Sequence, residues 1–163
     1  MNIPPYEREL LFRKAQGNKI LEKFEKKINS IFLNEYREES RKSLPETDQI
    51  IENLRSMQPT HCIERTYESL DECFNFIATR LAQKDFYALI DEDWKYCGAV
   101  LIEPNTKLNN NFNFNESTSD EIRFIAVDFS SQISVDYFED SDNHIYECSI
   151  KEYATPEKAP STP

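Results

Sequence analysis

The residues with the greatest capacity for acid–base chemistry are the two histidines of the chain, His61 and His144. A neutral imidazole is the usual general base near pH 7, so a histidine-dependent mechanism must use one of them. His61 precedes Cys62 and Glu64, a nucleophile and a carboxylate, but the spacing fixes no third residue that would orient them. His144 follows an acidic turn, where carboxylates favour a protonated, solvated ring. Neither pattern is a catalytic signature, and we expect a protein that is not an enzyme.

Cysteines and carboxylates suggest metal sites, and their spacing argues against the specific ones. A zinc site usually has paired ligands at short spacing, whereas this sequence has no Cys-x-x-Cys pair. An EF-hand loop that began at Asp140 would place Lys151 where the bidentate glutamate belongs. Glycine-rich nucleotide motifs and the Gly-x-Ser-x-Gly motif are also absent. We expect no cofactor, and only a low-affinity cation site at the acidic turns stays open. The four expected free thiols are Cys62, Cys73, Cys97 and Cys148.

Acidic residues are concentrated in the second part of the sequence. The 163 residues have a formal net charge of −11 at pH 7. Residues 1–60 carry 11 Lys and Arg against 10 Asp and Glu, whereas residues 61–163 carry 8 against 20. The electrostatic field of this negative charge repels nucleic acid and phosphate head groups and attracts basic proteins. We therefore expect a basic protein partner, and neither nucleic acid nor a membrane.

Aromatic residues in this acidic part are flanked by carboxylates, as in the segment from Asp136 to Asp140. An exposed aromatic ring can anchor in a partner's pocket while the acids around it pair with Lys and Arg. Alternatively, these residues are only the turns and edges of a sheet, where Asp is common and charge prevents aggregation. The candidate partner-binding residues are Asp91, Glu92, Asp93, Asp128, Asp136, Tyr137, Glu139, Asp140 and Asp142.

The N-terminal part that precedes these residues has helical periodicity. Apolar residues recur at intervals of three and four between residues 6 and 41, which predicts one long amphipathic helix or two, with Gly17-Asn18 as the only break. A shorter helix is predicted over residues 46–57 and ended by Pro59. Residues 60–67 look like a connector. Beyond them, a capping box opens a third helix whose core residues extend to Leu81.

After residue 84 the apolar period changes from 3.6 to 2, which predicts strands. The acidic turn Asp91-Glu92-Asp93 should join the first two strands as a hairpin, and the first three strands should be central because they are the most apolar. A loop of roughly 18 residues holds the Asn-rich stretch 109–115, and loops of this length are mobile or functional. The five expected strands are 86–90, 94–102, 121–129, 132–138 and 144–153.

Helices first and an antiparallel sheet second define an α+β fold. We expect the N-terminal helices to pack on one face of a C-terminal sheet of about five strands, with the other face in water. One domain should span residues 1–153, with a helical part over 5–83 and a sheet part over 86–153, followed by a disordered tail over 154–163. No apolar leader or long uncharged apolar window is present, which favours a cytoplasmic location.

In size, acidity and layout the chain resembles the small acidic immunity proteins that bacteria pair with secreted toxins, including those of contact-dependent inhibition systems. No sequence motif carries this resemblance, so no residue can be transferred from it. The resemblance implies that the acidic sheet end binds a basic toxin domain, often a nuclease, and blocks its active site or an adjacent surface.

Three functions therefore compete. The favoured hypothesis is an inhibitor or immunity protein that masks the cationic groove of a toxin. The second is an adaptor or phage-type antagonist that binds a partner through its N-terminal amphipathic helices. The third is an enzyme without a recognised motif, which would need His61 or His144 in a closed pocket beside carboxylates.

Overall fold

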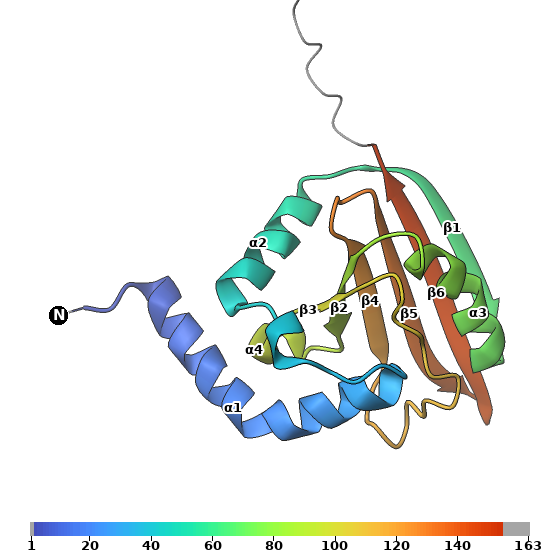
Figure 1. Cartoon of the computed structure of the whole chain (residues 1–163), viewed down its shortest axis with the longest axis horizontal. Helices are drawn as coiled ribbons and strands as arrows, with labels where there is room; N and C mark the ends of the chain where they lie inside the picture. The colour runs from blue at the N-terminus through green and yellow to red at the C-terminus, as the bar shows by residue number, and fades with distance from the viewer. Residues whose placement is uncertain (1, 155–163) are drawn as a thin grey trace, which may run out of the picture.

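A computed structural model describes residues 2–154, which form a six-stranded antiparallel sheet with helices around it (Figure 1). The α+β class is confirmed, and the sheet has one strand more than predicted. Of the predicted tail, only Ala154 is among the described residues. The helices are α1 (Pro5–Ile31), the short 3-10 helix η1 (Glu38–Ser40), α2 (Leu44–Arg55), α3 (Leu70–Leu81) and α4 (Trp94–Cys97). The strands are β1 (Pro59–Tyr67), β2 (Phe86–Ile90), β3 (Val100–Ile102), β4 (Glu121–Ala126), β5 (Ser131–Asp140) and β6 (Asn143–Tyr153), and their order in the sheet is β1-β6-β5-β4-β2-β3.

The predicted connector 60–67 is wrong, because this segment is the edge strand β1. It pairs antiparallel with β6, from Pro59 opposite Tyr153 to Tyr67 opposite Tyr146. Seven of its nine residues are exposed, so its sequence lacks the alternation of apolar and polar residues that marks a half-buried strand. Backbone pairing with β6 stabilises it instead. The predicted helical part therefore contains a strand of the sheet.

The strand predicted over residues 94–102 is also wrong in its first half. Trp94 to Cys97 form α4, and Gly98, with φ +88°, ends this helix in a conformation that favours glycine. Only Val100–Ile102 remains as β3, which pairs antiparallel with β2 as expected. The link between β2 and β3 is thus an acidic turn followed by a helix, and β3 is an edge strand rather than a central one.

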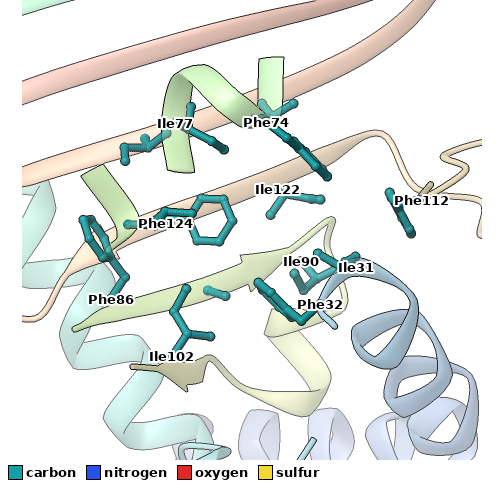
Figure 2. Close-up of a cluster of buried hydrophobic side chains, with 14 of the residues drawn as sticks. Ile31, Phe32, Phe74, Ile77, Phe86, Ile90, Ile102, Phe112, Ile122 and Phe124 are labelled. Atoms are coloured by element: carbon teal, nitrogen blue, oxygen red, sulfur yellow. The ribbon is translucent and has the colours of Figure 1, made fainter. Parts of the chain in front are cut away.

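One face of the sheet, which we call the covered face, is packed under α3 and the C-terminal end of α1. Phe32 meets Phe124 edge to face with ring centroids 6.4 Å apart, and both rings are almost fully buried. Figure 2 shows these side chains together with those that α3 directs toward the sheet. The labelled members of this core are Ile31, Phe32, Phe74, Ile77, Phe86, Ile90, Ile102, Phe112, Ile122 and Phe124.

The opposite face is covered only at one end. Ile50 of α2 packs with Leu89 of β2 and Ile125 of β4 in a second, smaller core. The expectation that the helices lie on one face therefore holds for α3 and the end of α1 but not for α2. Over β5, β6 and β1, and at the Glu121 end of β4, the same face carries mostly polar side chains and no helix formed by residues 2–154, and we call this region the open face.

Helix α1 is continuous through the predicted break. At Gly17 a side chain would overlap the backbone carbonyl of Tyr96, so glycine permits close contact between α1 and α4. The buried Arg13 donates two hydrogen bonds of 2.8 Å to the carboxylate of Asp48 in α2, and its Nε donates to the carbonyl of Lys95 at 2.7 Å. These contacts fix the N-terminal half of α1 against α2 and α4.

Candidate functional site

Two of the candidate partner-binding carboxylates, Asp91 and Asp93, form ion pairs within the protein. Lys27 of α1 lies 2.7 Å from the Asp91 carboxylate and 2.9 Å from that of Asp93. Oδ1 of Asp91 also accepts hydrogen bonds from the Ser119 hydroxyl and from the backbone N–H groups of Asp120 and Glu121. Side-chain exposure is 10% for Asp91 and 26% for Asp93. Asp91 therefore links the loop before β4 to helix α1, and Asp93 adds a second bond to that helix, which leaves both carboxylates little capacity to meet a partner.

Two further candidates make local contacts at the surface. Asp128 pairs with Lys84 at 3.0 Å and accepts hydrogen bonds from the backbone and hydroxyl of Ser130, which shapes the turn between β4 and β5. Glu92 lies 3.4 Å from Lys95, and its side chain is 81% exposed. Both carboxylates lie at the surface and remain accessible to a partner. Ion pairs this exposed contribute little to stability.

Tyr137 points to the covered face rather than outward. Its ring stacks on Phe114, with centroids 5.0 Å apart, and lies beside Tyr146. The hydroxyl group is 2.6 Å from Nδ1 of His144 and donates to the Glu139 carboxylate at 3.0 Å. Tyr137 is thus held within the protein, and it does not project as the anchor that the sequence suggested.

The aromatic residue that does project among carboxylates is Phe138. Successive residues of a strand point to opposite faces, so Phe138 shares the open face with Asp136 and Asp140. Its exposed fraction is 42%, and its neighbour across the strand pair is the half-buried Ile145 of β6. Phe138 is therefore the exposed aromatic ring flanked by carboxylates that the sequence predicted, with Tyr137 as the candidate residue. Alternation along this strand could have identified Phe138 had the buried face been known.

A row of three carboxylates crosses the open face next to Phe138. Glu121 of β4 lies opposite Asp136 of β5, and Asp136 lies opposite Glu147 of β6. Like charges directly opposite on neighbouring strands destabilise a sheet. Arg123 offsets part of this repulsion, since its Nε is 2.9 Å from the Glu121 carboxylate. Sequence analysis missed Glu121 and Glu147 because only the pairing of the strands brings them beside Asp136.

The electrostatic cost of this row falls on its central residue. Burial, together with repulsion from Glu121 and Glu147, raises the pKa of Asp136 to about 6. The nearby cation Arg123 pairs with the Glu121 carboxylate at 2.9 Å. A cationic group brought to Asp136 would favour its ionised form and release its proton.

We expect the stability gained by Asp136→Asn to depend on pH. An unfolded Asp has a pKa of about 3.9, so the folded protein holds extra protons between about pH 4 and pH 6. The cost of ionising Asp136 is therefore absent below pH 4, develops as the pH rises to 6, and is complete above it. Urea unfolding across this range should show the variant gaining stability over the unmodified protein as the pH rises. A gain that is constant with pH would contradict this explanation, and Asp140→Asn serves as an exposed control.

The hairpin between β5 and β6 extends the acidic surface beyond the row. Its two turn residues, Ser141 and Asp142, have positive φ angles of 49° and 71°. Asp140 and Asp142 are exposed, as is Glu139, which lies on the other side of the strand beside His144. The open face thus combines the carboxylate row, the Phe138 and Ile145 pair and an acidic tip, and this combination is the candidate functional site.

The features that an enzyme or a metal centre would need can be compared with the described residues. Both histidines are exposed, with 54% of the His144 side chain accessible, whereas a histidine-based mechanism was expected to need a closed pocket. Residues 2–154 contain no group of three or more Cys, His, Asp or Glu arranged to hold a metal ion. Within the same range, every helix is too short or too polar to cross a membrane.

No protein-family model, curated protein or solved structure matches the chain. The geometry of the open face is therefore the basis for assigning a function.

Proposed function

We propose that the protein is a non-catalytic inhibitor that binds a basic protein partner through the open face of its sheet, in the manner of an immunity protein with its toxin. The observation that carries this proposal is the row of Glu121, Asp136 and Glu147 beside the exposed Phe138. We place this activity in the cytoplasm, where a protein of this kind would meet an incoming toxin.

The row favours a cationic partner for a physical reason. Neighbouring strands are about 4.8 Å apart, so three carboxylates in register extend over roughly 10 Å. Lysine and arginine side chains on one surface of a partner can cover this distance and cancel the repulsion within the row. Phe138 and Ile145 supply the apolar centre that a charged rim alone lacks. A partner bound here would have its own cationic groove masked, which is how an acidic inhibitor would block a nuclease.

The experiment is a pull-down with the tagged protein from its native host at low salt and at about 0.5 M salt, where charges are screened beyond a few ångströms. The test variant is Asp136→Asn with Glu147→Gln. Its matched control is Glu103→Gln with Glu116→Gln, which removes the same charge from exposed positions away from the row. We expect one basic protein, recovered in stoichiometric amount by the unmodified protein and the control. Its recovery should be weaker at high salt, and the test variant should not recover it.

The identified partner is then purified, and its enzymatic or toxic activity is measured with and without the protein. Inhibition that requires the carboxylate row would support the proposal. A basic partner that binds the test variant and the control equally well would contradict binding through the open face. A partner whose activity is unchanged by the protein would contradict the inhibitor function.

A second candidate function, an adaptor that binds through α1, has one observation in its favour. Leu11 and Phe12 lie in the N-terminal half of α1 with exposed fractions of 59% and 60%. Deletion of residues 1–41 cannot test this candidate, because it would also remove Phe24 and Ile28 from the core. Replacement of Leu11 and Phe12 by serine leaves the buried side of α1 intact. Loss of the partner with this variant alone would favour the adaptor.

A further inference from the structure

A hollow among the described residues lies on a different surface from the open face. It is a cleft of about 600 Å³ between α1, the segment from η1 to the start of α2, and α4. This volume lies within the usual range for small-molecule sites. The apolar part of its wall is formed by Leu10, Leu44, Pro45 and Tyr96.

Three cationic side chains line the cleft, namely Lys14 from α1 and Arg41 and Lys42 from the segment before α2. None of them lies within 4 Å of a carboxylate among the ion pairs of residues 2–154. Two carboxylates, Glu38 and Glu46, also line the cleft, and that of Glu46 accepts a hydrogen bond from the Ser43 hydroxyl. The cations therefore outnumber the acids in a protein whose total charge is strongly negative.

Backbone contacts with β3 and the residue before it fix the chain at two of these cationic residues. Arg41 forms a bridge with Val100 at the edge of β3, and the Lys42 N–H donates to the Ala99 carbonyl at 2.8 Å. Both side chains are half-buried, so part of their hydration is already lost. Arg41 and Lys42 both line the cleft, and a guanidinium and an ammonium can each donate charge-assisted hydrogen bonds to a phosphate group.

We propose that this cleft binds a small organic phosphate, with its phosphate group at Arg41 and Lys42 and its apolar or aromatic part against Tyr96 and Leu10. The net charge of the protein does not prevent this, because charges more than about 8 Å apart are largely screened at physiological salt. The proposal concerns a surface separate from the open face, so it stands or falls independently of the inhibitor function.

The test is an NMR titration of the full chain, in which backbone amide signals are followed as AMP, inorganic phosphate or adenosine is added. We expect saturable shifts with AMP at residues around the cleft, weaker binding of phosphate and none of adenosine. Lys42→Glu should weaken AMP binding about tenfold or more, since it replaces a charged donor with a repelling acid. Lys107→Glu makes the same charge change at an exposed position outside the cleft and should leave binding unaltered.

Thermal unfolding of both variants confirms that they are folded before binding is compared, and Lys42→Gln serves where the glutamate variant is unstable. Absence of saturable AMP binding would overturn the proposal, as would equal weakening by Lys107→Glu. Phosphate binding as tightly as AMP, or adenosine binding as tightly as AMP, would overturn the assignment to an organic phosphate.

Discussion

Replacement of Asp91 by alanine should lower the free energy of unfolding by about 3 kcal/mol, the lower end of the range for breaking a buried ion pair. The Asp91 carboxylate bonds Lys27 and accepts three further hydrogen bonds from residues 119–121. The lower end applies because Lys27 keeps Asp93 as a partner. Alanine is also disfavoured at this position, where φ is +48°. Urea unfolding at pH 7 measures the loss.

Two further variants separate the contributions at this site. Asp91→Asn keeps an acceptor oxygen and tolerates the positive φ, so it should lose less stability than the alanine variant. Glu92→Ala, at an exposed neighbouring position, should change stability by no more than about 0.5 kcal/mol. Equal losses for Asp91→Ala and Glu92→Ala would contradict the buried role assigned to Asp91.

The pH dependence of this contribution has the opposite sign to that of Asp136. Burial favours a higher pKa for Asp91, but the hydrogen bonds from Lys27 and from the backbone of Glu121 and Asp120 lower it below its ordinary value. Stability supplied by Asp91 is thus present above the unfolded pKa of about 3.9 and is lost as the pH falls through the lower folded value. The unmodified protein should therefore lose its advantage over Asp91→Asn in acid.

Phe138→Ala should weaken binding of the basic partner by about 30-fold or more, the effect expected for an aromatic anchor at the centre of an interface. The same change should affect folding little, because the ring is 42% exposed in the free protein. Affinity is measured by calorimetry with the purified partner, and stability by urea unfolding.

The matched control is the adjacent residue on the opposite face. Tyr137→Ala removes a ring that stacks on Phe114 and a hydroxyl that contacts His144 and Glu139, so it should destabilise the fold by about 2 kcal/mol or more. At a temperature where this variant is folded, it should retain the partner. Loss of affinity with Tyr137→Ala but not with Phe138→Ala would place the interface on the covered face.

The sequence predicted the parts of the fold that have strong local signals. The helices around Phe24, Ile50 and Phe74 follow from apolar spacing, and Ser69 caps α3 by accepting from the Glu72 N–H, as the capping box required. Strand β1 gave no such signal, since its residues are mostly exposed and it is held by pairing with β6. At Trp94 a short helix takes the place of the expected strand, and Gly98 ends this helix with a positive φ.

The candidate site was only partly predictable for a related reason. Asp136, Asp140 and Asp142 were identified from acidic composition, and all three remain in the candidate site. Glu121 and Glu147 lie 26 residues apart in the sequence, and only the register of β4, β5 and β6 places them on either side of Asp136. The choice between Tyr137 and Phe138 required knowledge of which face the helices cover.

The position of β1 has a consequence for biosynthesis. Among the strands of residues 2–154, it pairs only with β6, whose residues 143–153 are translated long after residues 59–67. At about 5–20 residues per second, β1 would spend several seconds at the ribosome without a partner strand. The edge of the sheet would therefore close only when residues 143–153 have emerged. Because β6 also carries Glu147 and Ile145, the complete open face would form in that same final step.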